Sequence, residues 1–480
     1  MKRIISILLM SVFCFIQAAG QDKVVRKVME LGRDDNKAMV WEDFLANTIG
    51  GRPIGSHSLE DAEKWAEKQF RSWGMDVIVQ EVGEIAVGFT RGPWFGKMLS
   101  ADGMNLHFTT PGYTPGTKGP QRGTAVMQPK NRSEFERVKG TLKGAWVLLE
   151  KPSNGWPVAL DKTLPSDSTL SYGEIAAAGV LGFVQAAKNP ITTLYDRKGC
   201  FGLTMDNLPS VCDIKLDERQ FEIIKSKTLA KERVILEFDI RNHFFEGPVK
   251  FHNVIGVIKG SRYPDEYVIC GGHLDAFDTA SGAVDDGQGV SVTMESARLL
   301  AASGAKPKRT MMFALWTGEE YGLLGSEYFV KNNTVPLNKV SNYFNRDGGP
   351  EVAVSITVPE AMYSDFQEIA KPVADYNPEF PFVVKMREGQ PRPLPRRAGG
   401  SDHAYFAMNG VPTISLNLSD VKGSGFEYRE IWHTDADLYT RIVPEYLEHS
   451  SVVNAVMMYG VANLDHLLSR DGLYGEPEDK

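Results

Sequence analysis

The sequence predicts an α/β protein with a mostly parallel central sheet and helices on both of its faces. From residue 254 onward, apolar strand-like runs alternate with helix-like segments as far as residue 468. This alternation is typical of parallel sheets, because the chain must cross the sheet, usually as a helix, before the next parallel strand begins. A second observation is a change of texture between residues 113 and 242, where clustered proline and glycine precede short strand-like runs. We interpret that stretch as a β-rich domain inserted as a lid or spacer.

Each element of the main domain follows from a local pattern. A helix over 58–73 is predicted because apolar residues recur at helical spacing between a capping Ser58 and a terminating Gly74. A strand is expected next, at 77–82. After the inserted block, the expected strands are 254–258, 267–270, 309–316, 341–344, 352–356 and 413–416. The expected helices are 289–302, 325–331, 361–376, 404–408 and 445–468.

Charge and the N-terminal segment restrict the class of protein. The chain has 480 residues and a formal net charge of −8, and a nucleic-acid binder would normally show a basic face. Lys2 and Arg3 precede an apolar run over 4–16 and small residues at 18–20, the order of a secretory signal peptide. We therefore expect residues 1–20 to be cleaved and the protein to be exported, as a periplasmic or secreted protein. No later apolar run is long enough for a transmembrane helix.

Three cysteines remain after that cleavage, and export permits disulfides. Cys200 and Cys212 are close enough in sequence to pair across a loop, and the sequence leaves this pairing open. Cys270 lies in an apolar strand and is expected to be a buried free thiol.

Residues able to bind metal ions follow the ends of the predicted strands, where ligands gather in open α/β sheets. His273 and Asp275 come directly after the strand 267–270, and Asp285 lies in a glycine-flanked turn before a helix. Residues two apart in a strand point to the same side, so we expect Asp275 to accept a hydrogen bond from the second ring nitrogen of His273. Asp285 is expected to bridge two cations.

The pair Glu319-Glu320 is a sharper signal, because it ends an otherwise apolar strand. A strand that runs into a glycine turn can direct one carboxylate to a metal ion and leave the other over the attacking water. We expect Glu320 to be a ligand and Glu319 to be the general base, which takes a proton from the water and gives it to the leaving amine. Desolvation in a pocket would raise the pKa of Glu319 toward the value that this role needs.

Two further ligands complete a balanced set. Asp347 follows the strand 341–344, and His433 precedes a helix. His273 and Asp347 would bind one ion, Glu320 and His433 the other, and Asp285 would lie between them. Mixed imidazole and carboxylate ligation suits zinc, so the predicted cofactor is a pair of Zn²⁺ ions.

This set resembles the co-catalytic dizinc metallopeptidase family that contains bacterial leucyl aminopeptidases, aminopeptidase Y and glutamate carboxypeptidases. The matching pieces are His273-x-Asp275, Gly282 to Asp286, Glu319 to Ser326, Asp347, Ser401-Asp402-His403 with Gly410-Val411-Pro412, and His433-Thr434. Gly51-Arg52-Pro53 and the helix that follows look similar to the plasma glutamate carboxypeptidase (carboxypeptidase Q-like) branch. The resemblance implies a zinc exopeptidase fold, with a catalytic domain over 21–112 and 243–480. The block 113–242 looks like the protease-associated domain that family members often carry.

The region before His403 departs from the family pattern. Some family aminopeptidases place a tyrosine there to steady the oxyanion, whereas this chain has Arg396-Arg397-Ala398-Gly399-Gly400. The oxyanion-stabilising residue therefore stays open. We expect His403, Arg396 and Arg397 to contact substrate, because a guanidinium group can hold a substrate carboxylate through two hydrogen bonds. Ser401 lacks the pattern of a nucleophile elbow, so the triplet does not indicate a serine hydrolase.

Together these features predict an exported zinc-dependent exopeptidase. It would hydrolyse the terminal bond of peptides or dipeptides by metal-activated water, as an aminopeptidase or dipeptidase. A carboxypeptidase, a glutaminyl cyclase with one zinc ion and a non-catalytic, receptor-like protein are the alternatives. The sequence does not fix the side-chain preference or the oligomeric state, and homodimerisation is suggested by the resemblance alone.

Overall fold

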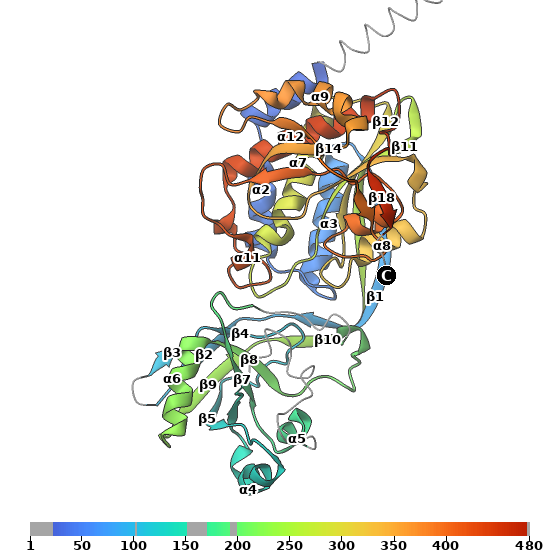
Figure 1. The fold of residues 1–480 in the computed structure, drawn as a ribbon. Coiled ribbons are helices and arrows are strands. Elements are labelled where there is room, and N and C mark those ends of the chain that lie inside the picture. Colours follow the sequence, from blue (N-terminus) through green and yellow to red (C-terminus); the bar gives the residue numbers. More distant parts are fainter. Residues whose placement is uncertain (1–22, 101–102, 151–169, 193–198, 478–480) are drawn as a thin grey trace, which may run out of the picture.

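The computed structural model describes residues 23–100, 103–150, 170–192 and 199–477 (Figure 1). The expected signal peptide, residues 1–20, lies outside these described residues. No helix in the described part of the chain has both the length and the apolar composition that a bilayer span requires. The predicted α/β class is confirmed, and the molecule contains two large sheets.

The first large sheet is mixed and has five strands in the order β1-β10-β12-β11-β13. These strands are β1 (Asp76–Thr90), β10 (His243–Ile258), β11 (Tyr263–His273), β12 (Arg309–Trp316) and β13 (Val340–Asn345). β11 pairs in parallel with β12 and β13, but β10 runs antiparallel to both β1 and β12. The sheet is therefore mixed, not mostly parallel, because the long strand β10 returns from the inserted block beside β1.

Helices cover both faces of this sheet. Successive side chains of the buried strand β12 point to opposite faces and, from Met311 onward, are apolar on both, so both faces need a cover. Met311, Phe313 and Leu315 pack with α3 (His57–Ser72), α7 (Gln288–Ala302), α9 (Glu360–Ala374) and α12 (Pro444–Asn463). Met312, Ala314 and Trp316 pack instead with α8 (Leu324–Lys331) and α10 (His403–Met408). α3 begins two residues earlier than the expected cap implies, since Ser56, not Ser58, accepts from the backbone N–H of Leu59.

Smaller elements extend the main domain. A three-stranded sheet has the order β15 (Val383–Met386), β14 (Val352–Val358) and β17 (Leu416–Ser419). A two-stranded sheet pairs β16 (Arg392–Leu394) with β18 (Tyr474–Pro477). Near the N-terminus lie α2 (Ala38–Asp43) and a π-helical turn over Phe44–Ile49, and the short α11 (Tyr428–Ile431) precedes His433.

The second large sheet has eight strands in the order β3-β2-β9-β5-β6-β7-β8-β4. Its strands are β2 (Trp94–Met98), β3 (Met104–Asn105), β4 (Phe108–Thr109), β5 (Gln121–Met127), β6 (Trp146–Leu148), β7 (Gly182–Ala187), β8 (Cys212–Asp217) and β9 (Ile235–Ile240), with helices α4 (Arg132–Leu142), α5 (Tyr172–Ala177) and α6 (Glu218–Leu229). This sheet has apolar clusters of its own, separate from those of the five-stranded sheet. Three of its strands, β2 to β4, precede residue 113, so the sheet starts upstream of the predicted boundary.

The strands β1 and β10 join the two parts, and Figure 1 shows them running from the five-stranded sheet to the eight-stranded one. They pair antiparallel from Asp76↔Val257 to Thr90↔His243, with irregularities between Glu81 and Gly83 and between Ile85 and Val87.

Cys200, Cys212 and Cys270 are all buried free thiols, so the disulfide that the sequence left open is not formed.

Candidate metal centre

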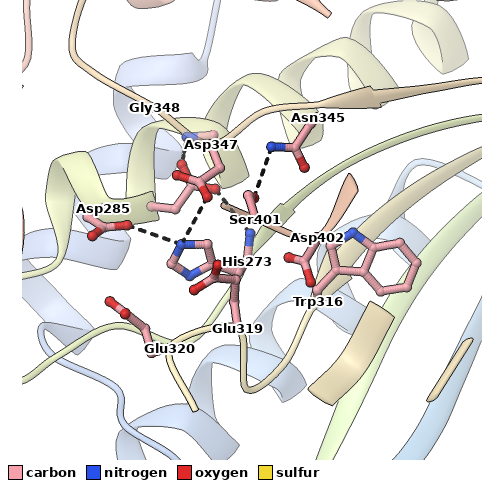
Figure 2. Close-up of polar contacts among 12 residues, drawn as sticks. His273, Asp285, Trp316, Glu319, Glu320, Asn345, Asp347, Gly348, Ser401 and Asp402 are labelled. Atoms are coloured by element: carbon pink, nitrogen blue, oxygen red, sulfur yellow. Dashed lines mark hydrogen bonds and ion pairs between the residues drawn. The ribbon is translucent and has the colours of Figure 1, made fainter. Parts of the chain in front are cut away.

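The five predicted ligands meet at the carboxyl ends of the parallel strands, where the sheet leaves side chains without a neighbouring strand. His273 is the last residue of β11, Glu320 follows β12, and Asp347 follows β13 (Figure 2). Asp285 lies in the turn Ala283–Gly287 that leads into α7. His433 comes from a distant loop, after α11.

These side chains form two groups that share Asp285. In the first group, the Nε2 atom of His273 lies 3.1 Å from Asp285 Oδ1 and 4.0 Å from Asp347 Oδ2 (Figure 2). In the second group, the Nε2 atom of His433 lies 2.9 Å from Glu320 Oε2 and 3.5 Å from Asp285 Oδ2. Each group therefore offers one imidazole and two carboxylates.

This geometry fits zinc. Ligand atoms about 2.0 Å from one tetrahedral zinc ion lie about 3.3 Å from each other, and the four distances above bracket that value. Asp285 Oδ2 is buried and has no hydrogen-bond partner among the described residues, which is expected of an atom that faces an ion. Burial opposes ionisation of Asp285, but the hydrogen bond with His273 and the nearby His433 hold the pKa of its carboxyl below the usual value.

Asp275 lies beside His273, but not as predicted. The Nδ1 atom of His273 is 2.9 Å from the backbone carbonyl oxygen of Asp275, whereas the carboxylate is 3.9 Å away. The Asp275 carboxylate accepts instead from the backbone N–H groups of Glu319 (3.1 Å) and Glu320 (3.2 Å). β11 ends at His273, so the strand alternation behind the prediction no longer applies at residue 275. Asp275 therefore holds the turn that carries Glu319 and Glu320.

The turn that carries Asp285 is held by residues that the sequence reasoning did not identify. Asp437 accepts from the backbone N–H groups of Val284 (2.7 Å) and Asp285 (3.3 Å). Burial and the charge of Asp285 raise the pKa of Asp437 to about 7. Beside it, the fully buried Arg52 donates to the backbone carbonyl groups of Gly50, Leu274, Ser281 and Gly282. Arg52 belongs to the Gly51-Arg52-Pro53 motif, which was the only signal for it in the sequence.

Glu319 is half-buried next to the two groups. Burial, with added repulsion from Glu320 and Asp347, raises the pKa of Glu319 well above its usual value. Asp402 also repels it, and burial raises the pKa of Asp402 to about 7. A raised pKa makes the Glu319 carboxylate a stronger base, as a group that takes a proton from water requires.

Aromatic rings enclose His433. The ring of Trp432 stacks on the imidazole with a centroid distance of 3.9 Å, and Phe277 meets it edge-on at 4.5 Å. The backbone of His433 has a φ of 55°, in the left-handed region that residues other than glycine seldom adopt. The neighbouring Tyr428 is half-buried, and burial together with the charges of Asp285 and Asp347 raises the pKa of its phenol.

The Ser401-Asp402-His403 triplet does not form a serine triad. The Ser401 hydroxyl accepts from the side-chain amide of Asn345 (2.9 Å, Figure 2), and Asp402 accepts from the Ser326 hydroxyl at 2.5 Å. The Nδ1 atom of His403 is buried and has no hydrogen-bond partner among the described residues. Burial and the nearby Arg392 lower the pKa of His403, which keeps its imidazole neutral at neutral pH.

The four arginines of the 387–397 loop have two different environments. Arg387 donates to the backbone carbonyl of Leu473 (3.1 Å), and Arg392 donates to the Tyr474 and Thr413 hydroxyl groups, so both fasten the C-terminal segment. Arg396 and Arg397 are exposed. Of the four arginines, Arg396 and Arg397 are therefore the two whose side chains are accessible to a substrate.

Two clusters of imidazole and carboxylate groups that share one carboxylate, with a further carboxylic acid beside them, define a metal-dependent hydrolase. The α/β fold places them at the carboxyl edge of the sheet.

Comparison with known proteins specifies the class. Residues 253–458 match the model of peptidase family M28. Carboxypeptidase Q from Mus musculus is 23% identical, over 95% of this chain and 92% of its own length, and the Homo sapiens protein is 22% identical, over 93% and 90%. Residues 253–458 therefore form a domain of peptidase family M28, the co-catalytic zinc metallopeptidases, which makes the protein a metallo-exopeptidase. The predicted family and the two-zinc cofactor are confirmed at this level.

Solved structures support the fold. The structure of a peptidase M28 precursor from Shewanella amazonensis SB2B has a TM-score of 0.61 at 23% identity and covers 94% of this chain and 98% of its own. A zinc aminopeptidase from Bacillus subtilis has a TM-score of 0.54 at 17% identity, over 92% and 98%.

Proposed function

We propose that this protein is an exported exopeptidase that removes the terminal residue of peptides or dipeptides, as an aminopeptidase or dipeptidase. The observation that carries this proposal is the pair of ligand groups that share Asp285, with Glu319 beside them. In this proposal His273 and Asp347 would hold one zinc ion and Glu320 and His433 would hold the other, and Asp285 would serve both groups. When bound, the ions would polarise the scissile carbonyl and make the attacking water more acidic.

Glu319 acts as the general base in this mechanism. It takes a proton from the attacking water and gives it to the leaving amine, which its raised pKa favours. The Asp275 carboxylate keeps the backbone of Glu319 and Glu320 in place, so that the base and a ligand keep a constant separation.

Tyr428 is our candidate for the residue that stabilises the oxyanion. Its raised pKa keeps the phenol protonated, and the charges of Asp285 and Asp347 contribute to that shift. A protonated phenol can donate a hydrogen bond to the developing negative charge, and a donor of this kind contributes about 10²- to 10³-fold to the rate. His403, which is neutral and has an unpaired ring nitrogen among the described residues, is proposed to contact substrate.

A carboxypeptidase is the second candidate, because the carboxypeptidase Q relatives align over nearly the whole chain. Arg396 and Arg397 bear on this choice. Either guanidinium could bind the free carboxylate of a dipeptide or of a peptide C-terminus.

Three substrates separate these activities. An aminopeptidase cleaves a free dipeptide and an aminoacyl amide, a dipeptidase cleaves the free dipeptide alone, and a carboxypeptidase cleaves the free dipeptide and its N-acetylated form. We expect the first or the second pattern, with two zinc ions per chain. A protein that contains both ions and cleaves none of the three contradicts the proposal.

The same panel tests the arginine clamp. In the double variant Arg396→Ala/Arg397→Ala we expect KM for the free dipeptide to rise about 10-fold, since a hydrogen bond to a charged group is worth roughly 1.5–3 kcal/mol. Turnover of the amide should not change. Arg137→Ala, on the exposed face of α4, is the matched control. Equal effects on both substrates would rule out the clamp.

Two other functions predict different metal contents. A glutaminyl cyclase would hold one zinc ion, and a non-catalytic protein of this fold would lack ligands. The presence of two complete ligand groups argues against both of these alternatives. Zinc stoichiometry together with the substrate panel distinguishes these alternatives from the exopeptidase.

We further propose that residues 113–242 form a protease-associated-type domain, with residues 21–112 and 243–480 as the catalytic domain. The separate apolar clusters of the eight-stranded sheet support a second domain, and β2 to β4 extend that domain upstream of residue 113. We also propose that the segment 1–20 directs export and is cleaved, which N-terminal sequencing of the mature protein tests. We propose further that the protein forms a homodimer, which light scattering tests.

A further inference from the structure

The loop that carries His433 is held from outside by the part of the chain that contains the eight-stranded sheet. Thr434 forms an isolated antiparallel bridge with Thr192, in the loop that follows β7. Asp435 donates its backbone N–H to the carbonyl of Ile191 (3.1 Å), and its Oδ1 atom accepts from the N–H of Ile191 (2.8 Å). Ile191 is fully buried, so this contact is shielded from water.

A second segment of the chain contacts the carboxylate of Asp435. The Nε2 atom of His107 lies 2.7 Å from Asp435 Oδ2. His107 immediately precedes the edge strand β4, and its carbonyl accepts from the backbone N–H of Asp217 at the end of β8 (3.0 Å). Asp217 also accepts from the side chain of Asn189 (3.4 Å), which lies two residues before Ile191. Asp435 is therefore tied to two segments that are themselves linked.

His433 needs such support because of its own backbone. It follows a helix of four residues and has a φ of 55°, a conformation that costs roughly 1–2 kcal/mol for a residue other than glycine. On its own side of the interface, the loop is closed by short bonds such as Thr434 N–H to the Ile431 carbonyl (3.0 Å). A strained conformation persists only where the surroundings determine it.

We propose that Asp435 is a positioning residue, which uses its contacts with Ile191 and His107 to hold His433 in place for its metal ion. This inference rests on the proposed assignment of His433 as a ligand. Removing a group that orients a ligand typically weakens metal affinity or activity by about 10- to 100-fold. The eight-stranded part of the chain would then contribute to metal binding without supplying a ligand.

Stepwise zinc binding to the metal-free full chain, followed with a chromophoric chelator, tests the proposal. Asp435→Ala should lower the affinity for one of the two zinc ions by about 10-fold and leave the affinity for the other unchanged. Asp435→Asn should lose less, because it keeps an acceptor for the Ile191 N–H. His107→Ala, at an exposed position, should cause an intermediate or smaller loss. The kcat of these variants at limiting zinc should fall with KM unchanged, and added zinc should restore it.

His466→Ala is the matched control. His466 and Asp365 form a pair at 3.0 Å with side-chain exposures of 57% and 18%, close to the 48% and 18% of His107 and Asp435. This pair lies on other elements, so zinc affinity should not change. If Asp435→Ala does not fold, His107→Ala carries the test alone.

His433→Ala separates this inference from the proposed function. If His433→Ala keeps both ions at full affinity, the ligand assignment is wrong. If His433→Ala loses one ion while Asp435→Ala and His107→Ala bind both like the original protein, the ligand assignment stands and the positioning role is wrong.

Discussion

The two halves of the metal centre are built differently. His273 ends a strand that is paired on both sides, and its second ring nitrogen is fixed by the carbonyl of Asp275. His433 lies in a loop with a left-handed backbone, and its stacking partner Trp432 is 46% exposed. The backbone ladder positions the first imidazole, whereas side chains and a distant loop position the second. On the proposed ligand assignment, we expect the His433 half to be the one whose occupancy depends on contacts outside the central sheet.

The largest expected effect concerns neither half. Glu319→Gln should lower kcat by about 10²- to 10⁴-fold, because it removes the general base. Both ions should remain, since Glu319 is in neither ligand group. Steady-state kinetics and metal analysis on the same sample check this. Loss of an ion would show that Glu319 belongs to one of the halves, and retained turnover would exclude it as the base.

Arg52→Met should remove the support of the first half. The substitution leaves the four carbonyl groups without their donor and removes the positive charge that favours ionisation of the buried Glu42 and Asp437. Breaking a buried charge network typically costs roughly 3–5 kcal/mol of folding free energy. Denaturant unfolding measures it. The control Arg71→Ala breaks a solvent-exposed pair with Glu67, for which a change below about 1 kcal/mol is expected.

Zinc release should show the difference between the halves directly. With a competing chelator, we expect two phases, the faster one from the ion held by His433 and Glu320. His433→Ala should remove the fast phase and keep the slow one. A single phase, or loss of the slow phase in His433→Ala, would contradict the comparison.

The smallest of these effects is expected from Asp437→Asn. An amide oxygen can still accept from one of the two backbone N–H groups of the Asp285 turn, but the anion is lost. Because both ligand groups share Asp285, we expect the affinity for both zinc ions to fall by about 10-fold. Asp435→Ala should instead lower the affinity for one ion only. Calorimetric zinc titration distinguishes the two patterns.

The sequence predicted the position of the candidate ligands best at the ends of strands. His273, Glu320 and Asp347 follow apolar runs, and the side chains that leave a parallel sheet at its carboxyl edge converge. His433 was placed only by its order in the chain and by resemblance, because nothing in a local pattern brings residue 433 to residue 320.

Supporting residues were harder to predict because their contacts are between side chain and backbone at long range. Arg52 binds the carbonyl of Leu274, and Asp437 binds the N–H of Val284, so hydrophobic periodicity contains no information on either. Asp275 was expected to orient His273 with its carboxylate, but the strand ends before it. The mixed character of the sheet also escaped prediction, since the return of β10 beside β1 depends on the block between them.

The pairing of β1 with β10 has a consequence for how the molecule could be cut. Thr90 faces His243 as the last register pair, so residues 91–242 are topologically the loop of one β-hairpin. The entropy of closing a loop grows only with the logarithm of its length, so replacing this long loop by a short turn is thermodynamically permitted. We expect such a shortened chain to keep the five-stranded sheet and to lose the contacts that hold Asp435. The five-stranded sheet thus carries the eight-stranded part through a single hairpin, and that part contacts the loop that carries His433.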